Sequence, residues 1–290
     1  MKIGLVLEGG AMRGMFTTGV LDVFMENNIE VDGVIAVSAG ALFGVNYVSK
    51  QIGRAIRYNK KFNQDKNYLG IIPLIKEGNI INTEYAYHRV PFELDIFDDE
   101  TYKNSPIPFI AVATEVKTGN PEYIPLKSVY QQMDVLRASG SMPFVSQPVK
   151  LGDKYYLDGG ISDSIPYQWM LDHGYDKVIV ILTRDINYVK KPMKSFFKYF
   201  IHKYPAIQER LLNRHTEYNE SINHLKELEQ QGIAYVIRPS MPIKIGKIES
   251  DPDKLQAVYD LGRKDALASL TSLQEFTQSS VYLHLQQMKW

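Results

Sequence analysis

The sequence of 290 residues contains no cysteine, which excludes a disulfide framework, a thiolate metal site and a cysteine nucleophile. An excess of charge is also absent, because 33 Lys and Arg residues balance 33 Asp and Glu residues. A chain without net positive charge lacks the uniformly basic surface with which proteins coat nucleic acids. We therefore expect no nucleic acid among its partners.

Long apolar runs are missing as well. The apolar stretch Ile3–Leu7 ends at Glu8, which is too early for a signal peptide. The longest stretch without charged side chains, Gly33–Ser49, contains the polar residue Ser38 and is shorter than the roughly 20 apolar residues of a membrane span. The sequence thus predicts a soluble, cytoplasmic protein.

Apolar runs alternate with stretches of helical spacing, which is typical of βαβ units and a largely parallel sheet. We expect one α/β domain over residues 1–290, with a core at about 2–184 and a helical C-terminal part at about 185–290 docked on it. Residues 59–104 are harder to interpret and include loops. The expected strands are Lys2–Leu7, Asp32–Val37, Pro108–Thr114, Lys154–Leu157, Lys177–Thr183 and Ala234–Arg238, and the expected helices include Ala39–Val48, Tyr130–Ala138, Tyr167–His173, Ile207–Gln231 and Lys254–Leu273.

The segment Ala36–Gly40 has the context of a nucleophile elbow, because it follows an apolar strand and opens an apolar helix. A sharp strand-to-helix turn would hold Ser38 in a strained conformation with its hydroxyl exposed at the helix N-terminus. That N-terminus carries partial positive charge, which favours a developing anion. Small residues two positions before and after the serine let strand and helix approach. Gly40 is one of them, and Ala36 stands where glycine is usual.

A glycine-rich turn lies between the first strand and the next helix, and three interpretations apply to it. Its backbone amides could form an oxyanion hole, cradle a dinucleotide phosphate, or simply close a tight turn. The dinucleotide pattern Gly-x-Gly-x-x-Gly fails at Ala11. The oxyanion hole fits better, because a candidate nucleophile emerges from the neighbouring strand. The residues of this loop are Gly9, Gly10, Ala11, Met12, Arg13 and Gly14.

Asp158 ends a later apolar strand and is followed by Gly159 and Gly160. A carboxylate at the end of a strand in a parallel sheet lies where active-site loops usually lie. The alternative is an aspartate that starts a turn, which is the more common role of an Asp-Gly pair.

Together these three segments resemble the patatin-like phospholipases, a family of serine acyl hydrolases. That family carries a glycine-rich loop, a Gly-x-Ser-x-Gly elbow and an Asp-Gly-Ala or Asp-Gly-Gly motif in this order. Here they correspond to Gly9–Gly14, Ala36–Gly40 and Asp158–Gly160, and the segment Ala138–Pro143 is a fourth local similarity. The resemblance covers about residues 2–184. It implies a three-layer αβα sandwich with a largely parallel central sheet.

The resemblance also implies lipid ester hydrolysis by a Ser–Asp dyad, with Ser38 as nucleophile and Asp158 as proton acceptor, and with no cofactor or metal. Arg13 would pair with a carboxylate or a lipid phosphate, or else face solvent. Two alternatives stay open. One is a catalytically idle lipid-binding protein of the same fold. The other is a nucleotide-binding oxidoreductase, against which Asp32 counts because it precedes the second strand instead of ending it.

The segment Lys190–Tyr204 combines five lysines with aromatic residues at helical spacing and contains no acidic residue. Such a helix can lie on an anionic membrane surface, so the sequence indicates a peripheral membrane contact there. The alternative is a helix whose aromatic side chains pack into the core while its lysines stay in water.

Overall fold

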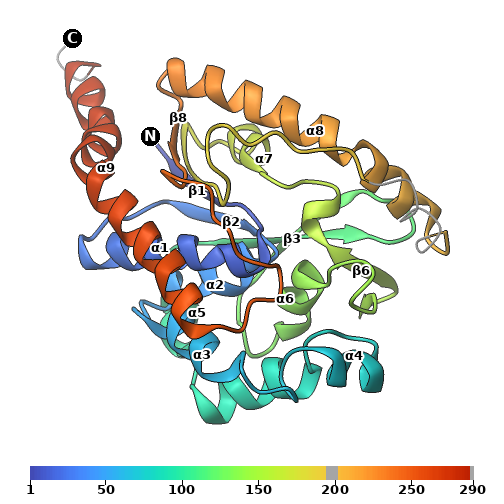
Figure 1. The fold of residues 1–290 in the computed structure, drawn as a ribbon. Coiled ribbons are helices and arrows are strands. Elements are labelled where there is room, and N and C mark those ends of the chain that lie inside the picture. Colours follow the sequence, from blue (N-terminus) through green and yellow to red (C-terminus); the bar gives the residue numbers. More distant parts are fainter. Residues whose placement is uncertain (194–201, 288–290) are drawn as a thin grey trace.

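A computed structural model of the chain describes residues 1–193 and 202–287, with side chains up to residue 278. Within these residues an eight-stranded mixed sheet forms the centre of the fold (Figure 1). Hydrogen-bonded neighbours follow the order β5-β6-β3-β2-β1-β7-β8, and β4 also pairs with β3. The strands are β1 (Ile3–Leu7), β2 (Gly33–Val37), β3 (Phe109–Glu115), β4 (Pro121–Pro125), β5 (Val149–Leu151), β6 (Lys154–Asp158), β7 (Lys177–Ile181) and β8 (Ala234–Ile237).

Five of these strands, β3, β2, β1, β7 and β8, run parallel to one another. Their residues are almost all buried, as expected of strands that are covered on both faces. The predicted α/β fold with a largely parallel sheet is thereby confirmed. The sequence analysis missed two short strands, β4 and β5. Strand β4 pairs antiparallel with β3, and β5 pairs antiparallel with β6.

The sheet is covered by helices on both faces, which gives three layers. Leu5 and Leu7 pack with helices α1, α2 and α9, whereas Val6 points to the other face and packs with α7 and α8. This alternation follows from the two-residue period of a strand. The helices are η1 (Ala11–Gly14), α1 (Met15–Glu26), α2 (Ala39–Val48), α3 (Arg54–Phe62), α4 (Ile71–Glu77), η2 (Tyr85–Leu94), α5 (Asp99–Asn104), α6 (Met133–Gly140), η3 (Gly159–Ile161), α7 (Tyr167–Asp172), α8 (Pro205–Gln230) and α9 (Pro252–Gln287).

Strands β2 and β6 meet end to end along one edge of β3. Ala113 pairs with both β4 and β6, so these two strands lie on opposite edges of β3. Strand β2 pairs with β3 over residues that β4 also contacts, and it therefore shares its edge with β6. Val37 lies opposite Val112, and Asp158 lies opposite the next residue, Ala113. The carboxyl ends of β2 and β6 are thus brought together.

Residues 54–104 form a small helical layer beside the sheet, built from α3, α4, η2 and α5 (Figure 1). Its buried cluster includes Phe62, Tyr68 and Val90. The helix η2 has π-type hydrogen bonding and contains Pro91, which has no N–H to donate to a regular helical ladder. Because the helices are short and η2 is irregular, the sequence shows no clear helical period here.

The long helix α9 crosses α1 at close range. A β-carbon on Gly19 would lie 2.1 Å from the carbonyl oxygen of Tyr259, and one on Gly262 would lie 2.1 Å from that of Phe16. The Tyr259 hydroxyl also donates to the Asp22 carboxylate at 2.7 Å. Both glycines are therefore required for the backbones to approach this closely.

We expect Gly262→Ala to destabilise the fold. Alanine favours a helix by about 1 kcal/mol over glycine, but a clash with the Phe16 carbonyl costs about 1–3 kcal/mol and prevails. The expected result is a melting temperature lower by about 2–6 °C, measured by circular dichroism. Gly246→Ala is the matched control, because its β-carbon would meet only the Ile248 amide at 3.9 Å. Equal melting of Gly262→Ala and the wild type would contradict the close crossing.

Among the helices that the structure describes, none has both the length and the apolar character that a membrane crossing requires.

Candidate active site

Ser38 occupies the turn between β2 and α2 in a strained conformation, with φ 55° and ψ −123°. A positive φ is unfavourable for a residue with a β-carbon and is typical of functional turns. The Ser38 amide donates to the Ser139 hydroxyl at 2.9 Å, which holds the turn from the side of α6. Ala36 lies fully buried within β2, and Gly40 lies in the first turn of α2. Ala36 is thus part of a regular strand, where its methyl group fits.

The Ser38 hydroxyl donates a hydrogen bond to Asp158 Oδ2 at 2.5 Å, across 120 positions of sequence. The other carboxylate oxygen, Oδ1, accepts the amide of Gly160 at 2.8 Å. Burial raises the pKa of the Asp158 carboxyl above its usual value, and the hydrogen bond from Ser38 acts in the opposite direction. The two side chains predicted from separate motifs are therefore in direct contact.

Gly159 lets Asp158 reach this position. A β-carbon on Gly159 would lie 2.1 Å from the carbonyl oxygen of Val112 in β3. The chain can turn away from the end of β6 only if this position has no side chain. The Thr114 hydroxyl, also on β3, donates to the Asp158 carbonyl at 2.8 Å and holds the turn.

The glycine loop lies directly against Ser38. A β-carbon on Gly9 would lie 2.8 Å from the Ser38 β-carbon. Ala11 adopts φ 49°, the conformation for which glycine is usual, so alanine takes the same turn at some cost in strain. The Arg13 amide donates to the Gly10 carbonyl at 3.1 Å and closes the 3₁₀ turn. Met12 and Gly14 are buried beneath the loop.

Glu8, directly before the glycine loop, lines the cavity and was not singled out by the sequence analysis. Only 3% of its surface is exposed. Its Oε2 accepts the amide of Thr183 at 2.5 Å and the Thr183 hydroxyl at 3.0 Å, and its Oε1 accepts the Tyr218 hydroxyl at 2.7 Å. These bonds connect the start of the glycine loop to the chain just after the carboxyl end of β7 and to helix α8.

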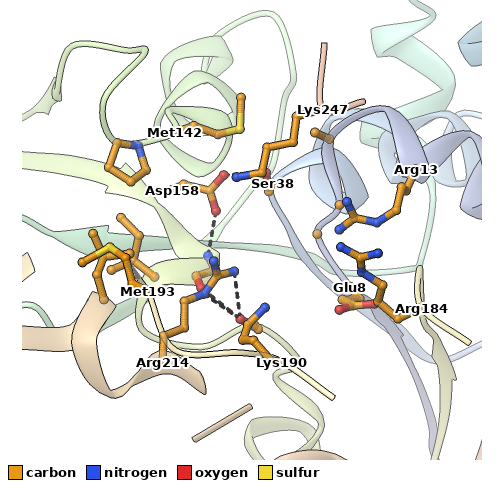
Figure 2. A pocket seen from close by; sticks show the side chains of 18 of the residues that line it. Glu8, Arg13, Ser38, Met142, Asp158, Arg184, Lys190, Met193, Arg214 and Lys247 are labelled. Atoms are coloured by element: carbon orange, nitrogen blue, oxygen red, sulfur yellow. Dashed lines mark hydrogen bonds between the residues drawn. The ribbon is translucent and has the colours of Figure 1, made fainter. Parts of the chain in front are cut away.

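A cavity of about 500 Å³ opens over Ser38 and Asp158. Figure 2 shows Met142 and Met193 on one side of it, and Arg13 and Arg184 on the other. The cavity therefore has an apolar wall and a basic wall. Its lining includes Glu8, Gly9, Gly10, Ala11, Arg13, Ser38, Met142, Pro143, Val145, Asp158, Gly160, Ile161, Ser164, Arg184, Tyr188, Lys190, Lys191, Met193, Leu211, Arg214, His215, Lys247 and Ile248.

Histidine does not take part in the Ser38–Asp158 contact. Among the described side chains, none of the histidines makes a hydrogen bond to either residue. His215 lies in the cavity wall, where its Nδ1 is 3.0 Å from the Leu212 carbonyl. His284 lies outside the described side chains. The described residues also contain no cluster of three His, Asp or Glu side chains that could hold a metal ion.

Asp32, which the oxidoreductase alternative would need as a ribose ligand, accepts the amide of Ile3 at 2.6 Å at the start of the sheet. It lies at the amino end of β2, whereas Ser38 follows the carboxyl end. Since β1 and β2 are parallel, Asp32 lies at the opposite end of the sheet from the glycine loop, which counts against the oxidoreductase alternative.

The helix expected over Lys190–Tyr204 does not begin at Lys190. Residues 190–193 form irregular chain that lines the cavity, and residues 194–201 lie outside the described part. The Lys190 ammonium stands 4.1 Å from the centre of the Tyr218 ring. This lysine therefore points into the cavity wall instead of away from the protein, because the buried ring of Tyr218 provides a cation–π partner.

Several curated proteins have similar sequences. The Escherichia coli (strain K12) protein YjjU is 31% identical over 186 residues, which cover 63% of this chain and 52% of that protein. An NTE family protein of Mycobacterium tuberculosis (strain H37Rv), Rv2565, is 25% identical, with 93% of this chain and 46% of that protein covered. Lysophospholipase nte1 of Aspergillus fumigatus is 26% identical over 62% of this chain and 12% of its own length. The chain thus spans about half the length of the first two relatives and less of the third.

Among solved structures, VipD from Legionella pneumophila aligns with 93% of this chain and 67% of its own, with a TM-score of 0.49 and 13% identity. Two family profiles match the sequence. The C-terminal residues 204–278 match a domain of unknown function (DUF6363). Residues 5–169, more than half of the chain, match the profile named patatin-like phospholipase and include the glycine loop, Ser38 and Asp158. The chain belongs to the patatin-like phospholipase family.

Proposed function

We propose that this chain is a serine-dependent acyl hydrolase of lipid esters. The observation that carries the proposal is the 2.5 Å hydrogen bond from the Ser38 hydroxyl to the buried Asp158 carboxylate at the floor of the cavity. A hydroxyl that donates to a carboxylate with a raised pKa is prepared to lose its proton as it attacks a carbonyl carbon. The chemistry needs a nucleophile, a base and an oxyanion site, and the family membership supports each of these roles.

In the acylation step, Ser38 Oγ forms a bond to the ester carbonyl carbon while its proton moves to Asp158 Oδ2. The carbonyl oxygen becomes an oxyanion, which accepts hydrogen bonds from the loop amides of Gly10 and Ala11. The Arg13 amide is already used within the turn. When the ester C–O bond breaks, the leaving alcohol takes the proton from Asp158, and the acyl group stays on Ser38.

In the deacylation step, a water molecule gives a proton to the same carboxylate and attacks the acyl carbon. The second tetrahedral intermediate uses the same amides. Its collapse releases the carboxylic acid and returns the proton to Ser38 Oγ. The bond from the Gly160 amide fixes the carboxylate in one orientation throughout, so that Oδ2 faces Ser38 in both steps.

A lipid is the proposed substrate because the cavity offers apolar side chains next to the dyad. Met142, Pro143 and Val145 approach from the segment after α6, and Ile161 and Leu211, which pack in one cluster with Met193, also line the cavity. A cavity of this shape can cover an acyl chain near the ester while the remainder extends outward. The name lysophospholipase, printed for one relative, is in line with this substrate class.

The proposal is tested by labelling the purified protein with a fluorophosphonate, which reacts with activated serine hydroxyls. We expect one equivalent of label, located on Ser38 by mass spectrometry of the digested protein. A catalytically idle lipid-binding protein would take up no label, and a label on another serine would contradict the assignment of the nucleophile.

We propose further that residues 1–290 form a single domain, because α9 crosses α1 closely and Tyr218 of α8 bonds Glu8 before the glycine loop. A single cooperative melting transition is expected in calorimetry.

Peripheral membrane contact through Lys190–Tyr204 also stays a prediction, now without Lys190 as a surface residue. Co-sedimentation with anionic liposomes tests it.

A further inference from the structure

Five of the six Lys and Arg residues that line the cavity beside Ser38 and Asp158 form the basic cluster: Arg13, Arg184, Lys190, Arg214 and Lys247. They come from four separate parts of the chain: the glycine loop (Arg13), the segment after β7 (Arg184 and Lys190), helix α8 (Arg214), and the loop between β8 and α9 (Lys247). Figure 2 shows them around the space next to Ser38 and Asp158. Only folding brings these charges together.

The protein neutralises this basic cluster only in part. None of its five members makes an ion pair with a carboxylate of the described residues. The carboxylates in the cavity lining are Glu8 and Asp158, and both already accept several hydrogen bonds. Arg13 Nε is buried and has no hydrogen-bond partner among the described residues. Five positive charges held together against only two carboxylates, neither of which forms an ion pair with them, indicate an anionic ligand.

Two members of the cluster are held in place by the surrounding structure. Asn219 on α8 accepts the Lys190 amide at 2.9 Å and donates to the Lys190 carbonyl at 3.0 Å, so the backbone of Lys190 is clamped from both sides. Arg214 donates through Nε and Nη2 to the Ser164 hydroxyl, at 3.3 and 3.2 Å. These positions are therefore built into the fold.

Mutual repulsion within the cluster supports the same conclusion. Burial, together with the neighbouring charge of Arg214, lowers the pKa of the Lys190 ammonium to about 7. The pKa of Arg13 is lowered by burial and by Arg184. An anion bound between these groups would offset the repulsion and favour their charged forms.

A choline headgroup would find no suitable contact in this wall. Quaternary ammonium groups bind to carboxylates or to the faces of aromatic rings. The face of Tyr188 is occupied by the Arg184 guanidinium at 4.2 Å, and that of Tyr218 by the Lys190 ammonium at 4.1 Å. The Glu8 carboxylate is buried and fully engaged. The positive charge of a choline group would therefore be repelled by the five basic side chains of this wall.

We propose that the basic cluster is the headgroup subsite of this enzyme, and that it selects acyl esters bearing a phosphomonoester over those with a zwitterionic headgroup. The inference rests on the proposed function, because the selected molecules are its substrates. Four of the five basic side chains follow residue 169, where the family profile ends, and Arg214 and Lys247 lie within residues 204–278. The C-terminal segment thus supplies specificity to a catalytic core that precedes it.

The test compares three monoacyl esters of equal chain length, used below their micelle concentrations so that no lipid surface is present. They are a monoacylglycerol phosphate, a monoacylglycerophosphocholine and an uncharged monoacylglycerol. We expect kcat/KM for the phosphomonoester to exceed that for the choline ester by about tenfold or more. In the double variant Arg214→Gln/Lys247→Gln this ratio is expected to fall by about tenfold. Equal rates for the two phospholipids in the wild type would overturn the proposal.

Lys244→Gln is the matched control, because Lys244 is an exposed lysine in the same loop as Lys247 and does not line the cavity. It should keep the wild-type ratio. Arg214→Lys, which keeps the charge, should retain a larger part of the preference than Arg214→Gln. Melting temperatures show that each variant is folded. A double variant that is folded and keeps the wild-type ratio would also overturn the proposal.

A binding measurement separates this inference from the proposed function. In Ser38→Ala protein, calorimetry should detect the monoacylglycerol phosphate and show at least tenfold weaker binding after the double substitution. That result would support the subsite even if the enzyme hydrolysed none of the three esters, an outcome that would refute only the proposed function. Inorganic phosphate is the second ligand. If it bound as tightly as the lipid, the site would serve a free anion, and the headgroup assignment would be wrong.

Discussion

Replacing Ser38 by alanine is expected to lower kcat/KM for ester hydrolysis by about 10⁴-fold or more, because removal of a serine nucleophile leaves only binding and oxyanion stabilisation to assist the attack of water. The fold should tolerate the change. The Ser38 amide keeps its bond to the Ser139 hydroxyl, and alanine bears the positive φ of this turn at much the same cost as serine. Steady-state hydrolysis of a soluble ester, with a melting curve alongside, measures both effects.

Ser49→Ala is a suitable control for this substitution. Ser49 is buried like Ser38, but it lies beyond the other end of α2, and its hydroxyl bonds to Asn46 and Gln51. Loss of its hydroxyl should leave hydrolysis unchanged. If Ser38→Ala retained activity comparable to that of Ser49→Ala, Ser38 would not be the nucleophile.

The parts of the site that the sequence predicted are those formed by contiguous residues. The elbow at Ser38 and the turn after Asp158 each follow an apolar strand, and apolar runs with small-residue turns are local signals. The sequence could not show that β2 and β6 end against each other on the same edge of β3, since strand pairing depends on contacts far apart in the chain. The resemblance to a family supplied that step.

The basic wall of the cavity could not be predicted in the same way. Arg184, Arg214 and Lys247 lie in segments that are far apart in the sequence. The net charge of the whole chain is zero, so it does not indicate that these three side chains meet in one cavity. The sequence did show a basic segment beginning at Lys190, but Tyr218 and Asn219, which hold that lysine in the cavity, lie on a helix that comes later in the chain. The backbone accommodates both alanines that stand in place of glycine, because Ala36 is in a regular strand and Ala11 adopts the glycine-like turn.

Asp158→Asn should separate activity from stability. An amide cannot accept the Ser38 proton, so we expect kcat/KM to fall by about 10³–10⁴-fold, the range for loss of a general base. The amide has nearly the same shape as the carboxylate, and its oxygen can still accept the Gly160 amide. Asp153→Asn, in the exposed turn between β5 and β6, is the control and should change neither property.

The pH dependence follows from the direction of the Asp158 pKa. Burial raises this pKa above 3.8, and only the ionised carboxylate can accept the Ser38 proton, so activity should fall with acid around a midpoint above 3.8. The stability that Asp158 contributes is fully present below the unfolded value of 3.8 and is lost as pH rises through the folded pKa.

At neutral pH the wild type therefore carries an unfavourable buried charge. Asp158→Asn removes it, and should melt higher than the wild type at pH 7, with a smaller difference in acid. A variant that melts lower at pH 7 would show that the charge of Asp158 is stabilised by its neighbours, Arg214 and Lys247 among them, and would contradict a raised pKa.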